Sequence, residues 1–113
     1  PKLIEQFISS DVAARMAQAD KRGDLYKEKP FVMDYEGVLV QGIIDVYFEE
    51  EDKIILVDYK TDRVREGGED ILIRRYRAQM ESYQQALEKI TGKCVKEIYI
   101  YSVTLQKTIP VHV

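Results

Sequence analysis

The sequence has one cysteine and one histidine among its 113 residues. A single cysteine, Cys94, excludes an internal disulfide framework and a cysteine-rich zinc site. A single histidine, His112, excludes a metal site built from several histidines. The sequence therefore belongs neither to the disulfide-stabilised domains nor to the zinc fingers.

Long hydrophobic runs are also missing. The longest, such as residues 54–57, are far too short to span a bilayer. The chain does not open with a basic segment followed by an apolar one, so nothing marks it for secretion. We therefore expect a cytoplasmic protein without a membrane partner. With 45% hydrophobic and 33% charged residues, the composition is that of one globular domain.

The charge is mildly acidic overall, with a net value of −3 from 17 basic and 20 acidic residues. This argues against a wholly basic nucleic-acid surface but allows a local basic patch. Residues 60–77 carry a net charge of +2, and the acidic run 49–52, expected to be a solvated loop tip, offsets them. The arginines that could contact DNA phosphates, or simply face solvent, are Arg63, Arg65, Arg74, Arg75 and Arg77.

The hydrophobic periodicity alternates between helical and strand patterns. Gly92 is a natural stop for the longest helix. The apolar face of that helix, expected to face the core, consists of Leu72, Tyr76, Met80, Tyr83, Leu87 and Ile90. We expect one or two short helices over 3–20, a charged loop over 20–29, strands at 31–35, 38–48 and 54–61, a loop over 62–70, a helix over 71–90, and strands at 95–104 and 108–113. This order predicts a single α/β domain over residues 1–113, with a mixed central sheet of about five strands flanked by helices.

The most informative polar residues lie at the end of the third expected strand. Asp58 and Lys60 point to one face because a strand has a period of two, and alone they could be an ordinary ion pair. A hairpin turning at 49–53 places Asp45 beside Asp58. Two converging carboxylates repel each other unless a cation lies between them. The sequence therefore predicts an oxygen-ligand site for a hard divalent cation such as Mg²⁺ or Mn²⁺.

A third group lies on the long helix. Gln79 and Tyr83 are four residues apart and share one face, and Arg75 extends the same row. These residues could reach the carboxylates. Alternatively, Tyr83 packs in the core and Gln79 is incidental.

Three motifs together resemble a known family. Gly42-Ile43-Ile44-Asp45, then Asp58-Tyr59-Lys60-Thr61, then Gln79 and Tyr83 are similar to the G-x-x-D, D-Y-K-T and Q-x-x-x-Y motifs of RecB-type nucleases. That family belongs to the PD-(D/E)xK, or restriction-endonuclease-like, superfamily. The resemblance covers residues 28–90 and is strongest to nuclease domains of the AddA type, found in bacterial helicase–nucleases.

The resemblance implies a restriction-endonuclease-like fold and a Mg²⁺-dependent deoxyribonuclease, an exonuclease in which Mn²⁺ can substitute. It implies that Asp45, Asp58 and the backbone carbonyl of Tyr59 bind the metal. It implies that Lys60 positions the attacking water and stabilises charge on the phosphate. Gln79, Tyr83 and Arg75 would support the site and contact DNA. The catalytic residues would therefore be Asp45, Asp58 and Lys60.

The resemblance also implies that the domain is part of a larger protein complex. AddA-type domains belong to bacterial, cytoplasmic helicase–nucleases that process double-strand breaks for recombination, acting on a single strand or a duplex end together with a second subunit. The chain has no G-x-x-x-x-G-K-[ST] loop, so ATP would serve only a helicase region absent from these residues.

One departure from the family pattern concerns a histidine. Family members carry one in an upstream helix, whereas residues 1–27 contain none and His112 lies far from that motif position. We expect the chain, which begins at Pro1, to be an N-terminally truncated fragment of a larger helicase–nuclease. Metal binding and cleavage by the isolated fragment would then be impaired. Glu28 is a candidate substitute ligand, although it falls in the expected charged loop.

Two alternatives stay open beside the nuclease. The domain could be a catalytically weak or inactive module that binds single-stranded DNA or braces the complex. Lys60 could instead act as a Schiff-base nucleophile, but such a lysine needs a lowered pKa and two nearby carboxylates have the opposite effect.

Overall fold

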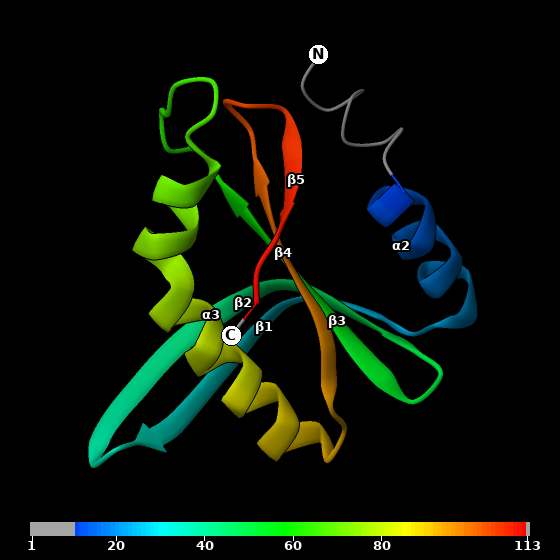
Figure 1. The fold of residues 1–113 in the computed structure, drawn as a ribbon. Helices are drawn as coiled ribbons and strands as arrows, with labels where there is room; N and C mark the ends of the chain where they lie inside the picture. Colours follow the sequence, from blue (N-terminus) through cyan, green and yellow to red (C-terminus); the bar gives the residue numbers. More distant parts are fainter. Residues whose placement is uncertain (1–10, 113) are drawn as a thin grey trace.

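The computed structural model describes residues 11–112, except for the side chain of Tyr35 (Figure 1). The expected helical residues 3–10 and the end of the expected last strand lie outside this range. The elements are α2 (Asp11–Arg22), β1 (Leu25–Tyr35), β2 (Val38–Glu50), β3 (Lys53–Lys60), α3 (Glu69–Thr91), β4 (Val95–Ser102) and β5 (Lys107–Pro110).

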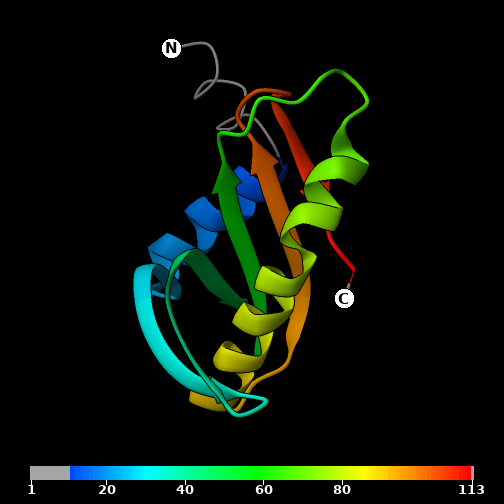
Figure 2. The same cartoon turned by 90° about the vertical axis from the view of Figure 1, so that its left-hand side faces the viewer.

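The five strands form one mixed sheet in the order β1-β2-β3-β4-β5. β3 and β4 are parallel, and the other neighbours are antiparallel. α3 connects the two parallel strands and covers one face of the sheet, while α2 lies on the other face (Figures 1 and 2). The expected α/β architecture, a mixed sheet of about five strands flanked by helices, is confirmed. Within residues 11–112, no helix has the length and apolar character needed to cross a membrane.

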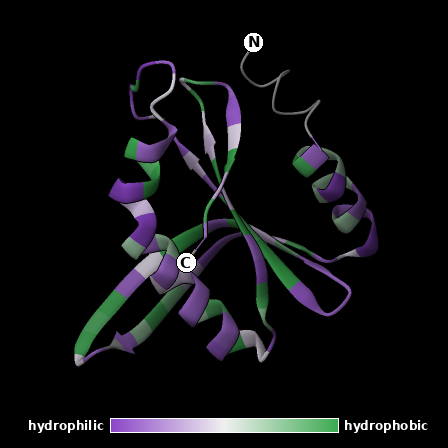
Figure 3. Cartoon of the chain, viewed as in Figure 1, coloured by the Kyte–Doolittle hydropathy of each residue, from purple (hydrophilic) through white to green (hydrophobic). Residues whose placement is uncertain are grey.

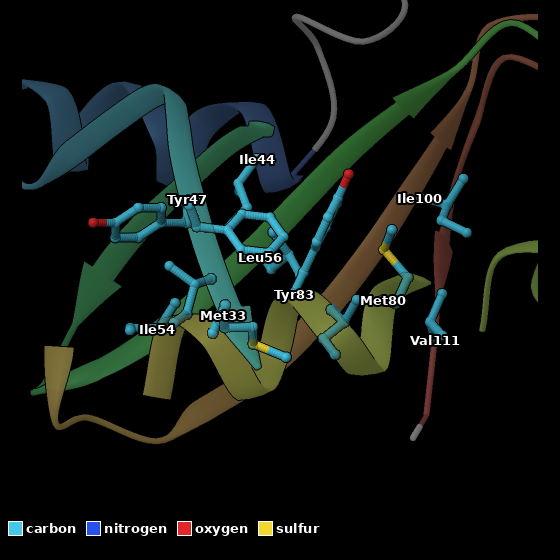
Figure 4. Close-up of a cluster of buried hydrophobic side chains, with 13 residues drawn as sticks. Met33, Ile44, Tyr47, Ile54, Leu56, Met80, Tyr83, Ile100 and Val111 are labelled. Carbon is cyan, nitrogen blue, oxygen red and sulfur yellow. The ribbon is translucent and has the colours of Figure 1, made fainter. Parts of the chain in front are cut away.

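The main core lies between α3 and the sheet (Figure 4). Residues 54–57 of β3 are fully buried because the central strand has a helix over each face. Figure 3 shows hydrophobic stretches along β2 and β3, whereas hydrophilic and hydrophobic residues alternate along α2 and α3. The buried α3 residues that fill this core are Met80, Tyr83, Ala86 and Leu87.

A smaller core lies under α2. Val12, Met16 and Ala19 recur at helical spacing and pack against the opposite face of β2 and β3. Arg15 on the same helix binds both Glu50 and Glu97, with nitrogen–oxygen distances of 2.8–3.1 Å. α2 is therefore held against the sheet by apolar packing and by the hydrogen bonds of the Arg15 guanidinium.

Three local expectations were wrong. Residues 25–29 are strand rather than loop, because they continue the antiparallel pairing with β2, where Tyr26 stacks on Tyr47 at 4.9 Å. Ile90 is 51% exposed rather than core-facing. The acidic tip is solvated only at residues 51–52, because Glu49 pairs with Lys93 and Glu50 with Arg15.

Other boundaries agree closely with expectation. α3 ends at Thr91, and Gly92 follows in the left-handed conformation with φ 71°, where its N–H donates to the carbonyl oxygen of Glu88. The β2–β3 hairpin turns at residues 51–52, close to the centre of the expected turn. The hairpin register is therefore the one that the sequence predicted.

Candidate active site

The candidate site lies where β2 separates from β3. Val46 and Val57 form the last paired position of the hairpin on this side. Beyond this pair, the backbone N–H of Tyr59 donates to Oδ2 of Asp45 at 3.0 Å. A side-chain oxygen thus takes the place of the missing ladder partner, which fixes the Asp45 carboxylate at the edge of β3.

The backbone of Tyr59 also faces this gap. In an extended strand, the N–H and C=O of one residue point to the same side. Because the N–H of Tyr59 is bound to Asp45, its carbonyl is directed toward β2 as well. The next residue points the other way, since the carbonyl oxygen of Lys60 accepts the N–H of Val103 at 3.0 Å. Asp45, Asp58 and the Tyr59 carbonyl therefore lie around one gap.

Asp58 is a buried carboxylate, with 2% of its surface exposed. Burial raises the pKa of Asp58 to about 6, with Lys60 lowering it and the neighbouring Asp45 raising it further. Its Oδ2 forms an ion pair with Lys60 Nζ at 2.8 Å. The ion pair that the sequence allowed is thus a buried one.

Lys60 lies at the centre of the polar contacts. Besides the ion pair with Asp58, its Nζ donates to Oε1 of Gln79 at 2.8 Å. The same nitrogen lies over the ring of Tyr76, 4.1 Å from the ring centroid. The side chain of Lys60 is 16% exposed, so only a small part of it is in contact with solvent.

The row on α3 runs from the core to the surface. Tyr83 is 8% exposed and packs edge-on against Phe31, with 5.4 Å between ring centroids. Burial, followed by the charges of Asp58 and Asp45, raises the pKa of Tyr83. Arg75 at the other end is half exposed. Tyr83 is therefore placed to support the site from the core, and Arg75 is placed where a ligand can reach it.

Two residues to which the motifs assign no role also contribute to the site. Asp62, two residues after Lys60, accepts the hydroxyl of Tyr76 at 2.8 Å and Arg75 Nη1 at 2.5 Å. Tyr76 was expected only as a core residue of the long helix. Its place one helical turn before Gln79 was the available signal, because residues three apart share a helix face.

Glu28 lies opposite Asp45, between the paired positions Lys27–Val46 and Lys29–Ile44. Its φ of 51° marks a local distortion of β1, and its side chain is exposed. Lys27, Glu28, Asp45 and Tyr59 line a pocket of about 390 Å³ beside the gap. His112 is exposed and follows β5.

The residues present fit a hard divalent cation. Two carboxylates converge at the gap, and carboxylate oxygens are the ligands that Mg²⁺ prefers. Within residues 11–112 no three acidic, histidine or cysteine side chains gather into one cluster. Waters and a substrate phosphate would have to complete the coordination, as is usual for Mg²⁺.

A surface hollow of about 570 Å³, larger than the pocket beside the gap, lies between the end of α2 and the β2–β3 turn. Lys93 pairs with Glu49 and Arg22 with Asp24 there, but acidic residues outnumber basic ones in its lining. It contains none of the motif residues. The volume of a surface hollow therefore does not identify the candidate active site in this molecule.

Comparison with known proteins agrees with the motifs. The model of the PD-(D/E)XK nuclease superfamily matches residues 4–109 of the chain. Curated relatives are named as one subunit of an ATP-dependent helicase/nuclease. One from Clostridium perfringens is 40% identical over 96% of the chain, and one from Lachnoclostridium phytofermentans is 39% identical over 94%. A Thermoanaerobacter relative is 54% identical over 69% of the chain.

The match covers a small part of these relatives. The chain spans 10% of the Clostridium protein, 11% of the Lachnoclostridium protein and 6% of the Thermoanaerobacter protein. The similarity thus concerns the nuclease portion implied by the family match, and the bulk of each relative lies outside it.

Proposed function

The chain belongs to the PD-(D/E)XK nuclease superfamily, and we propose that it is the metal-dependent DNA nuclease module of a helicase–nuclease. The observation that carries this is the convergence of the Asp45 and Asp58 carboxylates beside the Lys60 ammonium, with Asp58 buried and its Oδ2 2.8 Å from Lys60 Nζ. We propose residues 1–113 as one nuclease domain that hydrolyses a phosphodiester bond. The names of the relatives support the helicase–nuclease setting.

Each residue has a separable task. Asp45 and Asp58 would hold the metal, with the Tyr59 carbonyl directed toward the same gap. When bound, Mg²⁺ supplies a Lewis acid that lowers the pKa of water and stabilises charge on the phosphate. Lys60 presents a fixed positive charge to the phosphate and the attacking water. Water oxygen bonds to phosphorus while the bond to the 3′ oxygen breaks, leaving a 5′-phosphate and a 3′-hydroxyl.

The supporting residues keep these groups in place. Gln79 holds Lys60 by accepting a hydrogen bond at 2.8 Å. Tyr83 packs in the core beside both carboxylates. Arg75, which is exposed, is the residue of this row that would contact a DNA phosphate, and in doing so it would exchange its pairing with Asp62.

The finer identity is part of the same proposal. We propose Mg²⁺ as the ion, with Mn²⁺ able to substitute, and exonuclease action on a single strand or a duplex end during double-strand break repair and recombination. A second subunit would act with the parent protein in a bacterial cytoplasm, and ATP would serve only a helicase region outside these residues. The names of the relatives, each one subunit of a helicase/nuclease, support the partner and the DNA substrate.

A second candidate is a weak or inactive module that binds single-stranded DNA. One observation favours this candidate. In the part of the chain that the structure describes, no third acidic, histidine or cysteine side chain joins the two carboxylates. Such a module would bind DNA equally well with and without divalent metal. The nuclease would depend on the metal for cleavage.

The test is cleavage of end-labelled single-stranded and duplex DNA with Mg²⁺, Mn²⁺ or a chelator. The parent chain is compared with Asp58→Ala and Lys60→Ala. Asp20→Ala and Lys89→Ala remove the same side-chain types from exposed helix positions and serve as matched controls. We expect both site variants to lose cleavage by at least about a hundredfold and both controls to retain it.

Two results would overturn the nuclease. Metal-dependent cleavage that survives both Asp58→Ala and Lys60→Ala would show that another site, or a contaminant, cuts the DNA. DNA binding without cleavage in any metal would favour the binding module.

A further inference from the structure

We propose that Tyr76 is a positioning residue that holds the Lys60 ammonium in place for the phosphate. The inference rests on the proposed function, because it assigns a task within that site. The family motifs include Lys60, Gln79 and Tyr83 but not Tyr76. The evidence for Tyr76 is the distance of 4.1 Å between Lys60 Nζ and the centroid of the Tyr76 ring.

A lysine needs several contacts to be fixed. Its charge sits on a flexible four-carbon chain, so one carboxylate does not determine where the ammonium lies. In this structure Lys60 is held from three directions, by Asp58 on its own strand and by Gln79 and Tyr76 on α3. A cation over the face of an aromatic ring is attracted to its electron density, and more strongly when water is largely excluded. Lys60 meets that condition at 16% exposure.

The ring is itself held in position. The hydroxyl of Tyr76 lies 2.8 Å from both carboxylate oxygens of Asp62. Arg75 binds the same carboxylate, and the hydroxyl of Thr104 donates to the backbone oxygen of Asp62 at 2.8 Å. Asp62 thus ties α3 to the β4–β5 turn through the segment that follows Lys60. The Asp62 hydrogen bond also raises the pKa of Tyr76, so the phenol stays a donor at neutral pH.

The chemistry of the contacts explains why a ring is suitable. A carboxylate fixes a lysine but also neutralises it. The Gln79 amide and the Tyr76 ring are uncharged, so they hold the ammonium without cancelling its charge. Lys60 therefore remains able to stabilise negative charge on a phosphate. Asp58 supplies the one charged contact, and it is also a candidate metal ligand.

The test compares Tyr76→Phe with Tyr76→Leu. Phenylalanine keeps the ring and loses only the hydroxyl, whereas leucine removes the ring. The first readout is the NMR chemical shift of the Lys60 ε-methylene protons, which a ring face beneath the ammonium moves upfield. We expect the upfield shift in the parent chain, most of it in Tyr76→Phe, and its loss in Tyr76→Leu. This readout needs neither DNA nor metal.

The second readout is cleavage kinetics with Mg²⁺. We expect Tyr76→Leu to lower kcat by about tenfold to a hundredfold while KM changes little, because misplacing a catalytic group affects the reaction more than binding. Tyr76→Phe should recover most of the lost rate. Tyr26→Leu makes the same change at a partly exposed tyrosine on β1 and serves as the control.

The outcomes separate the two proposals. An unshifted Lys60 in the parent chain, or full kcat in a folded Tyr76→Leu, would overturn the positioning role. A parent chain that shows the shift but does not cleave DNA would count against the nuclease and leave the ring contact established. If Tyr76→Leu does not fold, Tyr76→Met serves instead, because its flexible side chain fills the space without a ring. We expect Tyr76→Met to lose the shift and to lower kcat, and unchanged values would overturn the inference.

Discussion

At the scale of single residues, Gly42 shows how the first motif is built. Gly42 faces Phe31 across the β1–β2 ladder. A Cβ at this position would lie 2.9 Å from Cε1 of Phe31 and 3.5 Å from Cε1 of Tyr83. A buried aromatic ring therefore approaches the backbone closely at this glycine. The same ring packs on Tyr83, which joins the first motif to the third.

Gly42→Ala should lower the free energy of unfolding by about 1–3 kcal/mol, because the added methyl group forces Phe31 out of a packed position. Urea denaturation measures the change. Gln41→Ala, at the exposed neighbouring position, should change stability by less than about 0.5 kcal/mol. Equal effects at the two positions would show that the Phe31 ring moves aside freely.

At the scale of elements, the β2–β3 hairpin sets the register on which the site depends. Its turn residues, Glu51 and Asp52, have φ of 50° and 66°. Two-residue turns with positive φ match the twist of the strands, but they favour asparagine and glycine. The hairpin therefore carries backbone strain at a position that does not take part in the chemistry.

Asp52→Gly should raise the free energy of unfolding by about 1 kcal/mol, since glycine adopts a left-handed conformation without steric cost. Thermal or urea denaturation detects the gain. Asp52→Ala keeps the β-carbon and should give no gain. Stabilisation by alanine as well would mean that the negative charge, and not the backbone conformation, is what costs stability here.

α2 is the element whose attachment should depend on pH. The hydrogen bonds from Arg15 hold the pKa of Glu97 at about 2, below its ordinary value of 4.5. A carboxyl whose pKa is lower in the folded state stabilises the fold above the ordinary pKa. That contribution is lost as the pH falls from about 4.5 to about 2.

Arg15→Met should therefore make the free energy of unfolding less dependent on pH between 5 and 3, as urea titrations at several pH values would show. Glu50, whose pKa Arg15 also lowers, adds to the effect. Lys96→Met removes a more distant cation, 3.7 Å from Glu97, and should leave most of the dependence in place. An unchanged slope in Arg15→Met would contradict the assignment.

At the scale of the whole molecule, the cation site should couple to folding. A ligand that binds only the folded chain stabilises it, by about 2.7 kcal/mol at a hundred times its dissociation constant. We expect Mg²⁺ or Mn²⁺ to raise the melting temperature of the parent chain, because the ion relieves the repulsion between two carboxylates at one gap.

Asp45→Asn and Asp58→Asn should abolish the metal-induced rise in melting temperature. Asp20→Asn, on the exposed side of α2, is the matched control and should keep it. A rise of the same size in all variants would place the ion elsewhere, for example at the acidic hollow beside the β2–β3 turn.

The sequence alone determined the features that follow from local geometry. The period of strands and helices predicted the mixed sheet and the long helix, and Gly92 marked the helix end. The short connection between β2 and β3 fixed their register, so the adjacency of Asp45 and Asp58 was predictable from counting residues. The roles of these residues stay predictions until metal binding and cleavage are measured.

Only the tertiary structure decided the features that depend on packing between distant segments. The charged residues 25–29 form a strand because they pair with the backbone of β2. Burial of Asp58, the ring of Tyr76 beneath Lys60, and the hydrogen bonds of Asp62 all require α3 to cross the sheet at one position and angle. Spacing along the chain constrains neighbours within an element, whereas these contacts are set by how side chains from separate elements fill shared space.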